Sequence, residues 1–339
     1  MDKLIVSYKS ERPKHGDSPK IEVLSKDNYK ISLINKDTNK KEIVKLITPG
    51  EIFEGGKQWF TNWLIIAENL NNGMILNNNY NAKNKTVFIK IDAYALGDNI
   101  AWMPYIDEFR KKHNCTVICS TFFNFLFSDV YPEILFVKPN IAVKNVYAQY
   151  YIGALKNENY KYSPVQVNSV PLQKVASEIL GLKFREIKTK IKIPENIKNR
   201  FDKKYICISE YASSEEKMWG INKWQIVVNF LNSMDYQVVV ISKEKTKLIN
   251  VIDATGNISL NERINDLIFS EFFIGVSSGL SWLAWSLNKK VLMISDGTPQ
   301  FHEFKCHRIG GESLSEINFN QSFKTPVKTV INSIKKNLF

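Results

Sequence analysis

The sequence predicts an α/β fold with two facing Rossmann-like domains, preceded by a small antiparallel β domain. The chain has 339 residues, and at about 150 residues per domain this length suits two domains with an appendage. From Thr86 onward, apolar strands alternate with helical segments, which is typical of parallel βαβ units. Before Thr86, short β segments follow one another without helices. The expected domains are residues 1–84, 85–182 and 183–339.

The N-terminal part combines a polar, Lys-rich start with a series of short strands. Residues 1–20 are expected to form a loose arm. Clusters of Asn, Asp and Gly at 35–39 and 71–73 predict turns between the segments that follow. The expected strands are Ile21–Leu24, Tyr29–Ile34, Glu42–Ile47 and Trp59–Ala67.

The first α/β domain begins with a strand that is apolar on both faces. Apolar residues then recur at helical spacing from Ile100 to Phe109. A charged linker at 183–194 ends the domain. Its expected strands are Thr86–Ile91, Thr116–Cys119 and Ile134–Val137, and its other expected helices are Phe122–Phe127 and Pro171–Leu182.

The second α/β domain repeats this alternation after the linker. Two such domains imply a cleft at the carboxyl ends of their strands, where ligands of this fold class bind. The expected strands are Tyr205–Ser209, Gln237–Ser242, Glu271–Val276 and Val291–Ser295, and the expected helices are Lys223–Met234, Glu262–Phe269, Leu280–Leu287 and Val327–Lys336.

Composition narrows the classes of partner. With 46 Lys and Arg against 34 Asp and Glu, the net charge is +12, which suits nucleic acid, an anionic membrane or a phosphorylated small molecule. The alternative is a compositional drift, since the basic residues are spread along the chain. The Trp and Phe residues are not interleaved with Lys and Arg, so nucleic acid is not the expected partner. No stretch reaches the roughly 20 apolar residues of a membrane span. Four cysteines and the absence of a signal peptide predict a cytoplasmic protein. The four histidines lack paired ligand spacing, so no metal is expected.

A glycine and an aspartate occupy the first strand-to-helix turn. Gly97 permits close approach of a ligand to the backbone, and Asp98 lies at the end of the strand that faces the crevice. Two interpretations of Asp98 remain open. The carboxylate either caps a helix that starts at Asn99 or serves as a catalytic base.

A lysine lies in the corresponding loop of the second domain, within Ser213–Trp219. Lys217 is placed to bring an ammonium group to an anionic ligand. The alternative is a solvated lysine beside Trp219, which would then be a packing residue.

A third turn lies between the strand that ends at Val276 and an apolar helix. Unpaired backbone N–H groups of Ser278 to Ser281 would point out of the helix start and form an anion site. One helix end supplies only about half a charge, so a diphosphate also needs a cation, for which Lys217 is the candidate. The alternative is that the small residues allow tight packing of strand on helix.

Together these motifs resemble the heptosyltransferase family of GT-B glycosyltransferases. The resemblance rests on the Gly97-Asp98 turn, the Lys217-x-Trp219 loop and the segment Phe273–Leu280. A narrower similarity, to bacterial autotransporter O-heptosyltransferases, is carried by Ala95–Ile106, Tyr147–Gly153, Pro171–Gln173 and Ser278–Trp285. This resemblance implies a cytoplasmic enzyme that transfers heptose from ADP-heptose to serines of autotransporter adhesins.

The resemblance also implies roles for individual residues. Asp98 would be the base that deprotonates the acceptor serine, and Lys217 would hold the diphosphate. Glu244 would bind the ribose, and Ile258 would contact adenine through its backbone. The full donor-binding set implied is Gly97, Ser213, Glu244, Ile258, Ser277, Ser278, Gly279, Leu280 and Ser281.

The chain departs from its relatives in three places. Ser277 and Trp282 stand where lipopolysaccharide heptosyltransferases usually have Asp and His, and this favours the autotransporter-modifying branch. That branch carries a four-cysteine iron-binding insertion, of which only Cys306 remains here, so we expect no iron and no other cofactor. Homo-oligomerisation is left open. The alternative functions are a lipopolysaccharide-core heptosyltransferase and an inactive nucleotide-sugar-binding or scaffolding protein.

Overall fold

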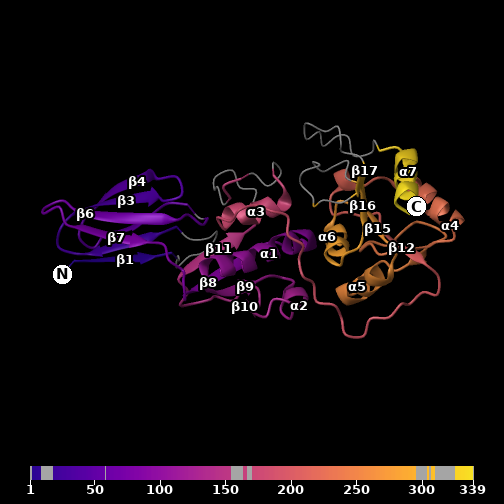
Figure 1. The fold of residues 1–339 in the computed structure, drawn as a ribbon, viewed down its shortest axis with the longest axis horizontal. Coiled ribbons are helices and arrows are strands. Elements are labelled where there is room, and N and C mark those ends of the chain that lie inside the picture. Colours follow the sequence, from indigo (N-terminus) through magenta and orange to yellow (C-terminus); the bar gives the residue numbers. More distant parts are fainter. Residues whose placement is uncertain are drawn as a thin grey trace.

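The protein consists of three parts arranged in a row (Figure 1). A β-rich part holds the N-terminus, an α/β part lies in the middle, and a second α/β part holds the C-terminus. This order confirms the predicted fold class. The computed structural model describes residues 2–8, 18–57, 59–153, 163–165, 170–294, 304, 307–309 and 325–338.

The β-rich part contains two antiparallel sheets. In β6 every second side chain is buried, because one face of its sheet packs on the core. The four-stranded sheet has the order β4 (Lys40–Ile47), β3 (Tyr29–Asn35), β6 (Trp63–Asn69), β7 (Ile75–Asn79). The three-stranded sheet has the order β1 (Lys3–Ser7), β2 (Lys20–Leu24), β5 (Ile52–Glu54).

The prediction of a loose arm over residues 1–20 is wrong for its start. Strand β1 pairs antiparallel with β2, from Lys3 opposite Leu24 to Ser7 opposite Lys20. Tyr8 is buried and forms a bridge to Ala148 in the middle part. These pairings join segments far apart in the sequence, and the short segment shows no periodicity that would reveal them. Residues 9–17 of the expected arm lie outside the described part of the chain.

The middle part is built on a four-stranded parallel sheet. Helix α1 (Leu96–His113) begins earlier and ends later than the expected apolar stretch. Strand β11 was not expected from the sequence. The sheet has the order β10 (Ile134–Val137), β9 (Thr116–Ser120), β8 (Thr86–Ile91), β11 (Ala148–Ile152), and the other helices are α2 (Asn124–Phe127) and α3 (Leu172–Ile179).

The C-terminal part is built on a parallel sheet of six strands. Helix α7 lies against α4 (Figure 1). The strand order is β14 (Ile252–Asp253), β13 (Gln237–Val240), β12 (Tyr205–Ser209), β15 (Phe273–Val276), β16 (Val291–Ile294), β17 (His307–Ile309). The helices are α4 (Ile221–Ser233), α5 (Leu260–Phe269), α6 (Gly279–Ser286) and α7 (Val327–Leu338), with a 3₁₀ turn at Glu215–Lys217.

Buried contacts connect all three parts. One apolar core runs from the β sheets through the middle part and reaches α5 and α6, and a second lies between the C-terminal sheet and helices α4 and α7. The segment 183–204 crosses between the α/β parts without forming a helix or strand. Along it, the Thr189 hydroxyl donates to the Ile100 carbonyl, and Lys188 Nζ donates to Asn288 Oδ1 at 2.9 Å. No helix in the described ranges is long and apolar enough to cross a bilayer.

Candidate active site

A cavity of about 790 Å³ lies between the two α/β parts. Its size is within the range of about 300–1,000 Å³ that is common for small-molecule sites. The lining comes mostly from the carboxyl ends of parallel strands and from the helix starts that follow them, as expected for this fold class. Residues that line it include Tyr94, Gly97, Asp98, Phe123, Ser213, Lys217, Lys243, Ile258, Arg263, Ser277, Ser278, Gly279, Leu280 and Trp282.

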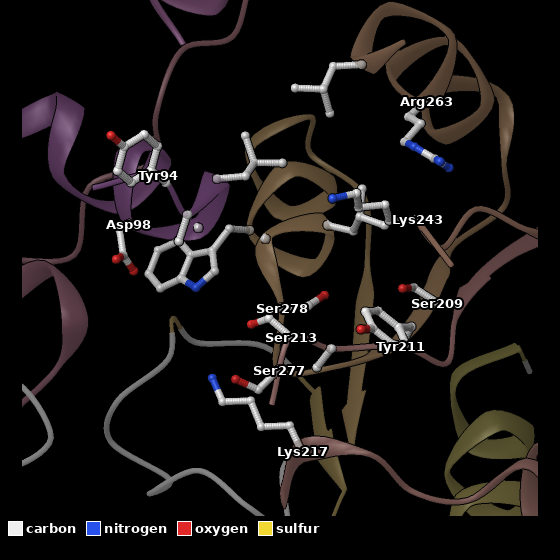
Figure 2. A pocket seen from close by; sticks show the side chains of 18 of the residues that line it. Tyr94, Asp98, Ser209, Tyr211, Ser213, Lys217, Lys243, Arg263, Ser277 and Ser278 are labelled. Carbon is white, nitrogen blue, oxygen red and sulfur yellow. The ribbon is translucent and has the colours of Figure 1, made fainter. Parts of the chain in front are cut away.

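Asp98 lies in the first turn of α1, on the middle-domain wall of the cavity (Figure 2). The helix begins at Leu96, and its N-cap residue is Ala95, which makes no side-chain capping bond. The capping interpretation of Asp98 is therefore wrong, because the helix starts before Asn99. The carboxylate is half-buried at the positive end of the helix dipole, where a negative charge is favoured.

The starts of α1 and α6 meet at two glycines. A Cβ atom added to Gly279 would lie 2.8 Å from Leu96 Cβ and 3.0 Å from the Gly97 nitrogen. A Cβ atom added to Gly97 would lie 3.2 Å from Trp282 Cδ1 and 3.4 Å from Gly279 Cα. Both glycines line the cavity. Because neither glycine has a side chain, the N-termini of two helices, one from each domain, can lie next to each other at a single site.

The start of α6 presents several hydrogen-bond donors to the cavity. Among the described residues, the backbone N–H groups of Gly279 and Leu280 donate to no backbone carbonyl, and the buried Ser278 Oγ has no hydrogen-bond partner. Ser281 behaves differently: its N–H donates to the Ser278 carbonyl at 3.1 Å, and its hydroxyl donates to the Val276 carbonyl at 2.7 Å. Ser281 thus closes the turn and does not line the cavity.

Two lysines reach the cavity from separate loops. Lys217 is half-buried at the end of the 3₁₀ turn after β12, and Lys243 follows β13. In the described part of the chain, neither ammonium group has a carboxylate partner. In Figure 2, Ser213, Ser277 and Ser278 lie between the two lysines. The C-terminal wall therefore combines two cations with hydroxyl and N–H donors, which suits an anionic group.

Arg263 fixes the backbone behind this wall. Its buried guanidinium donates to the Ala254 carbonyl at 3.1 Å, the Ser242 carbonyl at 3.1 Å and the Gly256 carbonyl at 2.8 Å, and also to the Ile241 carbonyl. Burial lowers its pKa. Four carbonyls from the loops after β13 and β14 are thus satisfied by one side chain, which holds both loops at the cavity.

The structure brings together most of the residues that the sequence singled out. Glu244 is exposed and does not line the cavity, so its role toward ribose stays a prediction. Sequence reasoning missed Lys243 and Arg263. Lys243 directly precedes Glu244 at the end of a predicted strand, and this position could have identified it. The predicted residues that line the cavity are Gly97, Asp98, Ser213, Lys217, Ile258, Ser277, Ser278, Gly279 and Leu280.

The described residues do not fit a metal centre. No group of three or more His, Cys, Asp or Glu side chains in the described ranges is placed to hold an ion. Cys115, Cys119 and Cys207 are buried and separate from the cavity lining. Cys306, the one cysteine that the resemblance connects with an iron-binding insertion, lies outside the described residues.

The fold and the cavity place this protein in the class of GT-B heptosyltransferase folds. A structure of the iron-containing, dodecameric heptosyltransferase TibC, in complex with ADP-D-β-D-heptose, superposes with a TM-score of 0.84. The match covers 98% of this chain and 95% of that chain at 22% identity. Because the N-terminal β sheets fall within the match, the similarity in fold extends beyond the two α/β domains.

Sequence comparison adds a family match: residues 161–301 match the model of glycosyltransferase family 9 (heptosyltransferase). Homologues of the chain include the autotransporter heptosyltransferase Aah of Escherichia coli, which is 33% identical over 236 residues. A protein of Burkholderia thailandensis described as an inactive autotransporter heptosyltransferase, BimC, is 26% identical over 238 residues. The aligned region covers 66% of this chain and 60% of Aah, so the chain spans less than two thirds of this relative.

Proposed function

We propose that this protein is a glycosyltransferase that transfers heptose from ADP-heptose to serine hydroxyls of an autotransporter adhesin, with inversion at the anomeric carbon. One observation carries the proposal. A single cavity has a carboxylate, Asp98, on one wall, and Lys217 with the N-terminus of α6 on the other. Homology to autotransporter heptosyltransferases supports the choice of donor and acceptor.

In the proposed reaction, the acceptor serine oxygen attacks the anomeric carbon of the heptose. A new C–O bond forms there while the bond between the anomeric carbon and the phosphate oxygen breaks. Asp98 takes the hydroxyl proton, since the serine hydroxyl remains protonated at neutral pH. ADP leaves with the electron pair of the broken bond. Lys217, Ser278 Oγ and the N–H groups of Gly279 and Leu280 stabilise the negative charge that develops on the diphosphate.

Hydrolysis of a glycoside is less consistent with this site than glycosyl transfer. Glycosidases generally use two carboxylates on either side of the scissile bond. Asp98 is the one acidic side chain among the described residues that line the cavity. In glycosyl transfer the donor already carries a diphosphate as its leaving group. The enzyme therefore requires a base for the acceptor but no second carboxylate.

The direct test is intact-mass analysis of adhesin passenger fragments incubated with this protein and ADP-heptose. Added heptose masses on the polypeptide, absent when ADP-heptose is omitted, would support the proposal. Binding of ADP-heptose without any transfer would support the alternative of an inactive binding protein, a type represented among the relatives. Transfer to lipopolysaccharide core but not to polypeptide would support the lipopolysaccharide heptosyltransferase.

Three further properties belong to the same proposal. We place the protein in the cytoplasm, supported by the free thiols of Cys115, Cys119 and Cys207. The proposed steps are assigned to side chains and backbone groups of the cavity, and the proposal includes no metal. Self-association is proposed on the likeness to TibC, which is described as dodecameric, and mass measurement in solution would test it.

A further inference from the structure

Two aromatic rings stack on each other at the mouth of the cavity. Tyr94, in the loop after β8, stacks on Phe122, in the loop after β9, with ring centroids 4.1 Å apart and an interplanar angle of 29°. Tyr94 lines the cavity and is nevertheless 79% exposed. Phe123, next to Phe122, also lines the cavity. A large ring that stays solvent-exposed beside a candidate base is available for contact with another molecule.

The position of this pair relative to the charged groups is informative. Figure 2 shows Tyr94 on the side of Asp98 away from Lys217, which lies at the opposite end of the view. In an inverting displacement, the attacking oxygen and the leaving group lie on opposite faces of the sugar. A diphosphate at Lys217 places the heptose next to it, and the acceptor oxygen then comes from the side of Asp98 and Tyr94.

We propose that the stacked pair Tyr94–Phe122 binds the acceptor polypeptide, contacting the chain that flanks the modified serine. This inference rests on the proposed function and assigns a binding surface to its acceptor. The stack holds the Tyr94 ring in place before binding, so little side-chain freedom is lost when a polypeptide packs against it. Tyrosine offers an apolar face to side chains and a hydroxyl to backbone groups, and it is enriched among residues that dominate protein interfaces.

Kinetics with both substrates test this surface. The variants are Tyr94→Ala, the conservative Tyr94→Phe, and Phe269→Ala as a control. Phe269 is an exposed ring at the end of α5 remote from Leu260, which lines the cavity. For Tyr94→Ala we expect the acceptor KM to rise about fivefold to tenfold, in line with loss of an aromatic contact. The Kd for ADP-heptose should not change, Tyr94→Phe should keep most of the affinity for acceptor, and Phe269→Ala should match the wild type.

Each other outcome counts against the inference. An unchanged acceptor KM in Tyr94→Ala would mean that the pair does not bind the acceptor. An increased Kd for ADP-heptose would mean that the ring instead stacks on the donor sugar. These results differ from a failure of the proposed function, in which wild-type protein transfers heptose to none of the passenger fragments supplied.

Discussion

Asp98 and Lys217 face the same cavity from different domains, and their charges are opposite. In the proposed reaction the two residues act in different steps: Asp98 removes the proton from the acceptor, and Lys217 stabilises the charge on the leaving group. Binding of the donor should not require Asp98, and binding of the acceptor should not require Lys217. Substitution of each residue should therefore affect a different measured quantity.

Replacement of Asp98 by Asn should remove the base while keeping the size of the side chain. We expect heptose transfer to fall about 10²–10⁴-fold, which is the usual contribution of a general base. The Kd for ADP-heptose should remain near that of the wild type. Asp92→Asn is a matched control, since Asp92 lies in the loop that precedes α1, does not line the cavity and pairs with Lys90 at 2.8 Å. Transfer at the wild-type rate in Asp98→Asn would disprove the assignment of the base.

Replacement of Lys217 by Ala should weaken donor binding. We expect the Kd for ADP to rise about tenfold or more, because a hydrogen bond to a charged group contributes about 1.5–3 kcal/mol. The Kd should also become less sensitive to salt. Calorimetry at two ionic strengths measures both effects. The exposed Lys247, which does not line the cavity, supplies the control Lys247→Ala. Equal affinities of both variants for ADP would show that Lys217 is merely solvated.

At the residue scale, the sequence predicts the site wherever a strand ends in a turn that contains Gly, Asp or Ser. Gly97, Asp98 and Ser278 are of this kind. Lys243 and Arg263 were missed for different physical reasons. Lys243 is one of several lysines in its loop, and only its position directly after the predicted strand distinguishes it from the others. Arg263 acts by binding carbonyls from two loops, which come together only when β13 and β14 pair in the sheet.

At the level of elements, the strongly apolar strands were predictable, and the polar or short ones were not. β8 and β12 are buried on both faces and stand out in the sequence. β7 reads Ile-Leu-Asn-Asn-Asn, a composition more typical of a loop, and it forms because β6 offers it a partner. β14 has two residues, too few for any pattern.

The close contact between α1 and α6 predicts that an added methyl group at this point would destabilise the protein. Gly279→Ala would place a methyl group 2.8 Å from Leu96 Cβ and 3.0 Å from the backbone nitrogen of Gly97, so the helix starts must move apart. We expect a loss of stability of about 1–3 kcal/mol, typical of overpacking, together with weaker ADP binding. Gly97→Ala should have a smaller effect, because its nearest neighbour is the side-chain atom Trp282 Cδ1 at 3.2 Å. Thermal unfolding and calorimetry provide the measurements, and wild-type values for Gly279→Ala would contradict the prediction.

In the whole molecule, a group of packed aromatic rings that includes Phe60, Phe109 and His113 joins the β-rich part to the middle domain. We call this contact the aromatic seam. His113, the last residue of α1, lies in this seam with its ring 4.3 Å from that of Phe109 and 5.0 Å from that of Phe60. Burial, with a smaller contribution from Lys112, lowers the pKa of His113 from 6.5 to about 4. Its Nε2 atom is buried and has no partner in the described part of the chain.

This burial makes the seam sensitive to acid. Below pH 6.5 the unfolded chain binds a proton at His113, whereas the folded chain does so only near pH 4. The free energy of unfolding should therefore decrease as the pH falls from 6.5 toward 4, and His113 should contribute no pH dependence above that range. Urea unfolding at pH 7 and pH 5 measures the difference. His113→Phe should lose less stability between these pH values than the wild type, and an equal loss in both proteins would contradict the assignment.

The contact between Gly97 and Gly279 also limits how the two α/β domains can move. A methyl group added to Gly279 would meet Leu96 Cβ at 2.8 Å and the Gly97 nitrogen at 3.0 Å, so the two domains already lie close together at this point. If this contact is kept, a change in the width of the cavity would come from rotation of the domains about it. Displacements would then grow with distance from the glycines, so the start of α6, where we propose that the diphosphate binds, would move least and the outer rim of the cavity would move most. Exchange of the donor would then proceed by a tilt of one domain against the other, with the smallest movement at the proposed leaving-group site.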